Sequence, residues 1–340
     1  MRIGYTMWGF LGTGITDTPD GSRSYRRPFI DGLIADGHDV VFLQRNRDLL
    51  EAGDDLGHLY RWDAGLPPLD ALLLEWRWPL PGRNTTTCGS PGHTCDLHRQ
   101  TELLDHYTVD RHTPTLVWDL DRQLPDYDPL RQLPNVAVGE FALLGTPGSR
   151  RLMCPVPDAL LDAADPVRLT RIPRPLPLVY VGNQYDRDEH FDTYFAPAAK
   201  VITHEVAGKW TRTERWPHVD FTGRVRFQDV DGIHRKALAT VLLLPERYWR
   251  TGHMTSRWWE ALLAGCVPLV PMEMRGADAY LPRELHVIDA EHVIDRIAWL
   301  RGIAGTSQHA DLLAACLAKL EPVRCSTVVA EAIQILEDLS

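Results

Sequence analysis

The sequence is poor in lysine and cysteine, and it has no long apolar run. No stretch of the 340 residues approaches the ~18 consecutive apolar residues of a membrane-spanning helix. Residues 1–6 open directly into an expected strand, without the charged and apolar regions of a signal peptide. The six cysteines are spread thinly, so we expect them to be reduced. These absences predict a cytoplasmic protein with no membrane span.

The positive charge is almost entirely arginine, since only four of the 36 basic residues are lysines. Acidic residues outnumber the basic ones, and the formal net charge is −10. This balance argues against a dedicated nucleic-acid-binding protein, which would usually be basic, although a local basic patch can outweigh the total. With 44% apolar residues, the chain has a globular composition, and its length suits two α/β domains.

The first residues predict a strand (1–6), a long loop with several glycines, a helix (24–35) and a second strand (39–43). Such a β-loop-α-β unit begins a doubly wound sheet. The loop does not fit the nicotinamide-binding fingerprint, in which the glycines open the helix at once. Here about nine residues separate Gly14 from the helix, and Gln44 stands where an acidic residue is expected. A nicotinamide oxidoreductase is therefore the least favoured class.

Carboxylates follow several expected strands of this half. Strands are predicted at 70–76, 115–121 and 135–144, and their carboxyl ends meet at one edge of a parallel sheet. Asp119 and Asp121 form a D-x-D pattern. This pattern can hold a divalent metal, supply a general base for a hydroxyl nucleophile, or cap the following turn.

Two carboxylates are the candidate catalytic bases, Asp119 and the loop residue Asp17. The residues expected on the acceptor side are Gly12, Gly14, Asp20, Glu75 and Asp121. For the loop aspartates at 17 and 20, which flank Pro19, turn formation is the alternative role.

Four potential metal ligands lie within eleven residues, in the pattern Cys88-x4-His93-x-Cys95-x2-His98. Two thiolates and two imidazoles can bind zinc tetrahedrally. The spacing is not that of a standard finger or knuckle, and His98 falls inside an expected helix (96–107). We therefore expect no bound metal and keep these four residues as an alternative zinc site.

Prolines crowd between residues 150 and 177 and mark a linker between two α/β units. We expect an N-terminal domain over 1–160, a linker over 161–177, a second domain over 178–322 and a final helix over 323–340. The elements expected after the linker are strands at 178–183, 200–204, 219–224, 240–245 and 285–288, and helices at 234–239, 291–300, 309–320 and 326–339.

A short helix that enters a buried strand is predicted by the stretch TSRWWEALLAGCVPLVP. Thr255 or Ser256 can cap the helix through a hydroxyl, and Gly265 suits the left-handed residue that ends one. Glu260 is a polar residue in an otherwise apolar helix middle, one turn after the N-terminus, where unpaired N–H groups attract anions. It can accept from ribose hydroxyls while the helix start holds a diphosphate. The alternative is an ion pair with Arg257.

Three short motifs in the second half resemble the GT-B glycosyltransferases, and within them the family-4-type and spore-protein (CgeB-like) branch. They are Gly182-Asn183 after a strand, Phe221-x-Gly223, and Ser256-x3-Glu260-Ala261-x2-Ala264-Gly265-x2-Pro268. The resemblance covers residues 178–275 and is weak in the first half. It implies an α/β fold of two tandem doubly wound, Rossmann-like domains with a cleft between them. It also implies a sugar-nucleotide site in the second domain and an acceptor site against the first, with the last helix crossing back.

The same resemblance implies that Glu260 holds the ribose of the donor. The expected nucleotide-sugar site is Glu260, Ser256, Thr255, Arg257, Gly182, Asn183, Gly223, Arg224 and Arg247. Retaining members often carry a second glutamate eight residues before the first; here that position is Gly252, so the stereochemistry stays open. The usual Arg…Lys diphosphate pair is not evident after Gly182, and the candidates to replace it are Arg224, Arg247, Arg250 and Arg257.

These features predict a cytoplasmic glycosyltransferase that moves a sugar from a UDP- or GDP-sugar to an acceptor hydroxyl. No tightly bound cofactor is expected, because arginines and a helix start can neutralise the leaving diphosphate. The acceptor is a natural product, a cell-envelope intermediate or a hydroxymethylated base of phage DNA. For DNA, a basic lip is expected from Arg23, Arg26, Arg27, Arg77 and Arg83. The alternative is a non-catalytic two-domain protein that binds a nucleotide or a sugar.

Overall fold

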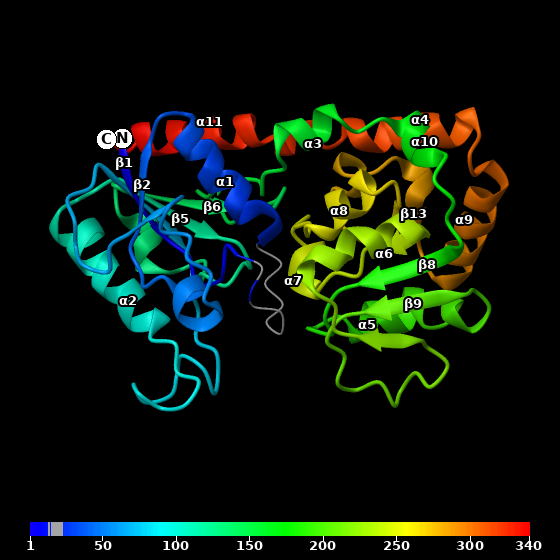
Figure 1. Ribbon diagram of the computed structural model, residues 1–340, viewed down its shortest axis with the longest axis horizontal. Coiled ribbons are helices and arrows are strands. Elements are labelled where there is room, and N and C mark those ends of the chain that lie inside the picture. Colours follow the sequence, from blue (N-terminus) through cyan, green and yellow to red (C-terminus); the bar gives the residue numbers. More distant parts are fainter. Residues whose placement is uncertain (13, 15–22) are drawn as a thin grey trace.

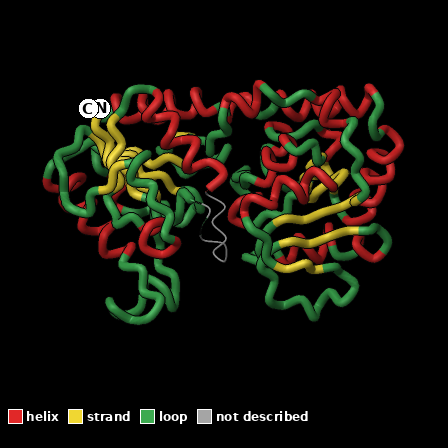
Figure 2. The backbone as a smooth tube through the Cα atoms, in the orientation of Figure 1, coloured by secondary structure: helices red, strands yellow, loops and turns green. Residues whose placement is uncertain are grey.

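The computed structural model describes residues 1–12, 14 and 23–340, and it contains two parallel sheets set side by side (Figure 1). The first sheet has seven strands in the order β3-β2-β1-β4-β5-β6-β7, and the second has six in the order β10-β9-β8-β11-β12-β13. Neighbouring strands are parallel throughout both sheets. Figure 2 shows the strands inside each half with helices around them. The predicted α/β fold with two doubly wound sheets is therefore confirmed.

The elements of the first half have these bounds. The strands are β1 (Arg2–Thr6), β2 (Asp39–Phe42), β3 (Arg61–Trp62), β4 (Ala71–Glu75), β5 (Thr115–Asp119), β6 (Val136–Glu140) and β7 (Arg150–Arg151). The α-helices are α1 (Arg23–Ala35), α2 (Asp96–Leu103), α3 (Asp158–Asp162) and α4 (Pro166–Thr170). Strands β4 and β5 are buried along their whole length, as expected for the middle of a parallel sheet covered on both faces.

The elements of the second half follow. The strands are β8 (Leu176–Val181), β9 (His204–Ala207), β10 (Phe221–Gly223), β11 (Ala237–Val241), β12 (Val267–Pro271) and β13 (His286–Val287). The α-helices are α5 (Asp188–His190), α6 (Val230–Lys236), α7 (Glu246–Trp249), α8 (Arg257–Leu263), α9 (Ala290–Ile303), α10 (Ser307–Ala318) and α11 (Cys325–Glu337).

Two expected elements of the second half are wrong in position. The strand predicted at 200–204 is absent there, since β9 begins only at His204 and the side chain of Val201 is 70% exposed. The apolar residues within 200–204 therefore do not form a buried strand. The helix predicted at 234–239 lies earlier, as α6, because Ala237 is fully buried in β11, where it pairs with β8.

The last helix, α11, crosses back to the first half and packs against α1 and β5 (Figure 1, red). Gly32 of α1 permits this close approach, since a Cβ there would lie 2.8 Å from Cys325 Sγ and from Val329 Cγ2. Cys325 Sγ also donates to the carbonyl of Pro28 at 3.1 Å. The two halves are thus joined by two chain segments. The domain bounds given above stay a prediction.

None of the helices within residues 1–12, 14 and 23–340 is long and apolar enough to cross a membrane.

Candidate active site

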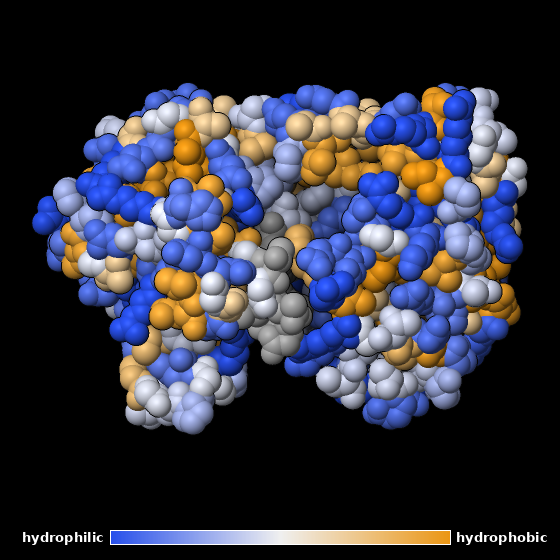
Figure 3. Space-filling view, viewed as in Figure 1, coloured by the Kyte–Doolittle hydropathy of each residue, from blue (hydrophilic) through white to orange (hydrophobic). Residues whose placement is uncertain are grey.

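A cavity of about 710 Å³ lies between the two sheets. Its wall is formed by residues that follow β1, β4, β5 and β6 of the first sheet and β8, β9 and β11 of the second. Figure 3 shows a deep notch between the two halves on the lower side of the molecule. The carboxyl ends of parallel strands are where doubly wound sheets bind ligands, and this volume suits a small molecule.

The cavity is strongly positive in a chain that is acidic overall. Eight arginines of the described part of the chain line it: Arg26, Arg47, Arg77, Arg83, Arg187, Arg224, Arg247 and Arg257. Within the same part of the chain, three carboxylates line it with them: Glu75, Asp121 and Asp186. Because the whole chain has a net charge of −10, this local excess of positive charge marks a site for an anion.

Backbone forms part of the cavity wall on the side of the second sheet. Gly182 and Asn183 follow β8 there, and the Gly182 N–H donates to the carbonyl of Ala207 at 2.9 Å. Asn183 Oδ1 accepts from the N–H of Lys209 at 2.8 Å. Gly208 has φ +140°, and a Cβ there would lie 2.0 Å from the Gly182 carbonyl oxygen. A glycine is therefore required where these two strand ends touch, which leaves the wall open to close approach by a ligand.

Three arginines of this wall differ in their partners. Arg187, which the sequence analysis missed, donates to backbone carbonyls, including that of Leu243 at 3.1 Å. Arg247 pairs with Asp186 at 2.7 Å. Arg224 is exposed, and among the described residues it has no hydrogen-bond or ion-pair partner. Of the other predicted residues, Gly223 is exposed and does not line the cavity.

The start of α8 lies at the cavity, with Thr255, Ser256 and Arg257 in its wall. The predicted hydroxyl cap is not formed by Ser256, which has helical backbone angles (φ −55°, ψ −24°) instead of the extended ones of a capping residue. Gly265 ends the helix in the left-handed conformation (φ +74°), as predicted.

Glu260 forms the ion pair with Arg257 that was the alternative to ribose binding. Its side chain is 12% exposed, and it is one turn behind the residues of α8 that line the cavity. Arg257 Nη1 donates to Glu260 Oε2, whereas Glu260 Oε1 is buried with no partner among the described residues. The pair lies at the wall of the cavity through Arg257, and the ribose role of Glu260 stays a prediction.

The two aspartates after β5 differ sharply. Asp119 is fully buried, and its oxygens accept from the N–H groups of Gln123 (2.9 Å) and Leu124 (2.8 Å). Burial raises the pKa of Asp119 to about 6, although these backbone donors oppose the shift. Asp119 does not line the cavity, so its geometry fits the turn cap and neither the base nor the metal pair. Asp121 does line it, and accepts a short hydrogen bond from the Tyr248 hydroxyl of the second half.

Glu75, expected on the acceptor side, lines the cavity but is held by two partners. Arg26 contacts both of its oxygens at 2.7 Å, and the Tyr5 hydroxyl donates to Oε1 at 2.7 Å. This carboxylate is 3% exposed. It therefore orients Arg26 at the cavity and is poorly placed to accept a substrate proton.

The glycine loop is engaged with other residues of the first half. The N–H of Gly12 donates to Asp48 at 2.8 Å, and that of Gly14 donates to Asp54 at 2.9 Å. Neither glycine lines the cavity. Their predicted acceptor role is not supported by this geometry. Asp17, Asp20 and the side chain of Arg23 lie outside the described residues. Of the other residues of the predicted lip, Arg26, Arg77 and Arg83 line the cavity, and Arg27 does not.

Aromatic rings on the first-sheet side of the cavity were also missed by the sequence analysis. They follow β1 and β4 and include Trp8, Phe10, Trp76 and Trp78. Guanidinium groups lie over two of the rings, Arg47 at 4.5 Å from the Phe10 centroid and Arg77 at 5.5 Å from that of Trp78. The signal was present in the sequence, since tryptophans flank Arg77 directly after the strand that ends at Glu75.

No protein-family model and no curated protein matches the sequence. Solved structures do match it. A DNA-modifying β-glucosyltransferase, solved with and without uridine diphosphoglucose, has a TM-score of 0.64 at 11% identity, over 99% of this chain and 100% of that one. A glycosyltransferase from Rickettsia africae ESF-5 has a TM-score of 0.58 at 11% identity, over 99% and 98%. An α-glucosyltransferase, in complex with UDP and a 13-mer DNA with a central A:G mismatch, has a TM-score of 0.56 at 12% identity, over 99% and 100%. Identities this low show the fold alone, and the fold of this chain is that of the GT-B glycosyltransferases.

Proposed function

We propose that the chain is a glycosyltransferase that moves a sugar from a nucleoside diphosphate to an acceptor hydroxyl. The observation that carries this proposal is the arginine-rich cavity between the carboxyl ends of two parallel sheets. A diphosphate is a compact anion, and guanidinium groups match its oxygens with paired N–H donors. The same charges stabilise the diphosphate as it leaves, so the transfer does not require a metal ion. We also propose that the enzyme is cytoplasmic. Its proposed branch of the GT-B glycosyltransferases is the CgeB-like one.

The donor lies against the second sheet in this proposal. Its diphosphate contacts Arg187, Arg224 and Arg257 beside the bare backbone at Gly182. The buried, unpartnered oxygen of Glu260 accepts from a ribose hydroxyl once Arg257 turns toward the phosphates. An unsatisfied buried acceptor is costly, so a donor group from the ligand is favoured there.

Asp121 is the proposed base. Of the three carboxylates that the described residues contribute to the cavity wall, Glu75 is held by Arg26, and Asp186 is paired with Arg247. Asp121 has one side-chain partner among the described residues, the Tyr248 hydroxyl, and keeps acceptor capacity for a substrate hydroxyl. It takes the hydroxyl proton while the acceptor oxygen bonds to the sugar carbon and the bond from that carbon to the diphosphate breaks.

The acceptor lies against the first sheet, and a hydroxymethylated base in DNA is the first acceptor to test. Rings such as Trp78 offer a face on which a base can stack, and the exposed Arg83 can contact a phosphate. A base must leave the duplex to reach a recessed carboxylate such as Asp121. Two structural neighbours, one a DNA-modifying enzyme and one solved with DNA, support this choice. Natural products and cell-envelope intermediates are the other acceptors.

Thermal unfolding with UDP, GDP, ADP and TDP is the first experiment, followed by transfer from the matching nucleoside diphosphoglucose to DNA containing hydroxymethylated cytosine. One diphosphate should raise the unfolding midpoint, because a ligand of the folded state stabilises it. Transfer to DNA should fall steeply with salt, since phosphate contacts release counterions. If none of the four nucleotides raises the unfolding midpoint, the proposed donor site is wrong. Binding without transfer or donor hydrolysis favours the non-catalytic alternative. Donor hydrolysis without transfer to this DNA excludes it as the acceptor, and transfer with a flat salt response contradicts the phosphate contacts.

A further inference from the structure

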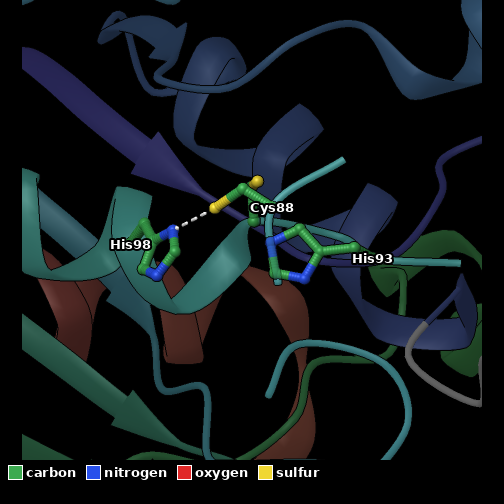
Figure 4. A group of neighbouring side chains, drawn as sticks. Cys88, His93 and His98 are labelled. Carbon is green, nitrogen blue, oxygen red and sulfur yellow. Dashed lines mark hydrogen bonds between the residues drawn. The ribbon is translucent and has the colours of Figure 1, made fainter. Parts of the chain in front are cut away.

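Outside the cavity, two cysteines and two histidines between β4 and the first turn of α2 lie close together, namely Cys88, His93, Cys95 and His98. Figure 4 shows three of them, with the side chains of His93 and His98 on either side of Cys88. Cys88, His93 and Cys95 belong to the loop, and His98 lies in the first turn of α2. One ligand atom from each residue lies within 4.8 Å of the other three. Cys88 Sγ and His98 Nδ1 are 3.1 Å apart.

The loop that brings these side chains together has almost no apolar interior. Within residues 79–95, all of which are described, the one buried residue is the polar Asn84. Its side chain accepts from the N–H of Leu80 at 2.6 Å and donates to the carbonyl of Trp78 at 3.0 Å. A segment that cannot bury apolar surface usually depends on a cross-link or a metal for a fixed structure.

The backbone bends sharply beside the four side chains. Gly89 (φ +85°) follows Cys88 and Gly92 (φ +77°) precedes His93, both in the left-handed region that favours glycine. Cys95 also has a positive φ (+50°) and makes no capping bond at the start of α2. These bends let side chains that are only a few residues apart converge.

One hydrogen-bond chain fixes which nitrogen of His93 is available. The Thr86 hydroxyl donates to the carbonyl of Arg83 at 3.1 Å, so its oxygen accepts from His93 Nδ1–H at 3.1 Å. His93 Nε2 then carries the lone pair, and it is buried with no partner among the described residues. Histidine ligands commonly donate their second ring N–H in this way, which holds the ring with its free nitrogen toward the metal.

We propose that Cys88, His93, Cys95 and His98 bind one zinc ion, a structural site that fixes the loop between β4 and α2. Zinc prefers four nitrogen and sulfur ligands in a tetrahedron, with Zn–N and Zn–S bonds of about 2.0–2.3 Å. These bonds place the ligand atoms about 3.3–3.8 Å apart, so the four side chains need to close only slightly. Binding releases two thiol protons, and the two thiolates balance the charge of the ion. The ion lies apart from the cavity and takes no part in sugar transfer.

The zinc ion would fix the part of the loop around residues 88–95, whereas other contacts already hold the loop where it leaves β4. Arg77 pairs with Asp96 at 2.7 Å, and its backbone exchanges two hydrogen bonds with the side chain of Gln100. Through Thr86 and the carbonyl of Arg83, the metal is linked to an arginine of the cavity wall. The loop therefore keeps Arg83 at the cavity mouth when zinc is bound.

Metal analysis of the purified full-length chain tests the proposal, and it does not depend on any transferase activity. The protein is incubated with zinc chloride, desalted and measured for metal content. We expect one zinc per chain, near zero in Cys88→Ser and Cys95→Ser, and one in the controls His58→Ala, an exposed histidine elsewhere, and Cys316→Ala. Thr86→Val should weaken zinc binding about tenfold or more while keeping the four ligands.

Two further readouts cover a variant that folds poorly. Cobalt substituted for zinc in the wild type should show the absorption of tetrahedral thiolate ligation. A chelator should open residues 79–95 to protease while the rest of the chain stays intact. Absence of zinc after loading, iron in its place, or equal zinc in Cys88→Ser and the wild type would each overturn the site.

Discussion

The two walls of the cavity differ in how many of their arginines have a carboxylate partner among the described residues. Within this part of the chain, three of four are paired on the first-sheet side (Arg26, Arg47 and Arg77, but not Arg83), and two of four are paired on the second-sheet side (Arg247 and Arg257, but not Arg187 and Arg224). On the first-sheet side, Arg26 is neutralised by Glu75, and Arg77 by Asp96 beside the ring of Trp78. On the second-sheet side, Arg187 donates to backbone carbonyls, which leave its charge in place. Arg224 has no partner among the described residues. A neutralised arginine holds its neighbours in position, whereas an arginine without a carboxylate attracts an anion.

The difference divides the proposed reaction between the two halves. The second-sheet wall has charge and exposed backbone, which suit a diphosphate. The first-sheet wall has rings and, among the residues that the structure describes, one available carboxylate, which suit an acceptor. Substitutions on one wall should therefore change donor binding, and substitutions on the other should change transfer without changing donor binding.

The largest effect is expected from Asp121→Asn. An amide of the same size keeps an acceptor for the Tyr248 hydroxyl but cannot take a proton. Loss of a general base lowers kcat by about 10²–10⁴. The stabilisation by the bound nucleotide should not change. Steady-state transfer and thermal unfolding with the same diphosphate measure the two quantities, and a kcat equal to that of the wild type removes Asp121 from the mechanism.

Arg257→Gln should act on the opposite wall. Hydrogen bonds to charged groups contribute about 1.5–3 kcal/mol, so the nucleotide Kd should rise about 10–100-fold. The substitution also leaves Glu260 without its ion-pair partner, and thermal unfolding without nucleotide measures that loss of folding stability separately from the loss of binding. Arg301→Gln, at an exposed arginine of α9, is the matched control. Titration calorimetry reads the Kd, and an unchanged value would place the diphosphate elsewhere.

Buried groups in the two halves should respond to acid in opposite directions. In the second half, burial lowers the pKa of His234 and His253 to about 3, so the unfolded chain binds protons that the folded chain does not. Stability is therefore lost as the pH falls below the ordinary histidine pKa near 6.5, by about 2 kcal/mol per histidine at pH 5. In the first half, the raised pKa of Asp119 has the reverse effect between about pH 6 and 3.8.

His234→Leu tests this contrast. Neither ring nitrogen of His234 has a partner among the described residues, so a similar-sized apolar side chain should be tolerated at pH 7.5. The variant should lose about 2 kcal/mol less stability than the wild type between pH 7.5 and pH 5. Urea unfolding at the two pH values measures this, with the exposed His58→Leu as the control. Equal losses in His234→Leu and the wild type would mean that the folded protein binds a proton at His234.

The sequence predicted most of the strands and helices. In the candidate site it predicted mainly the features that depend on backbone conformation. Strand runs and glycine stops such as Gly265 depend on neighbours in the sequence. The roles of Asp119 and Asp121 depend on which way each side chain leaves the end of β5, and a D-x-D pattern does not encode that choice. Arg187 was missed because its partner carbonyl at Leu243 is 56 residues away, on another strand end.

The smallest effect is expected from Arg83→Gln, at the exposed edge of the first-sheet wall. An exposed phosphate contact contributes little at physiological salt, so the KM for DNA should rise only a few-fold, and the logarithmic salt slope of KM should fall by about one. The nucleotide-induced shift should stay at the wild-type value, since this arginine belongs to the acceptor wall. Arg27→Gln, at an exposed arginine that does not line the cavity, is the matched control. An equal change in both variants would show that net charge, and not this position in the wall, sets DNA affinity.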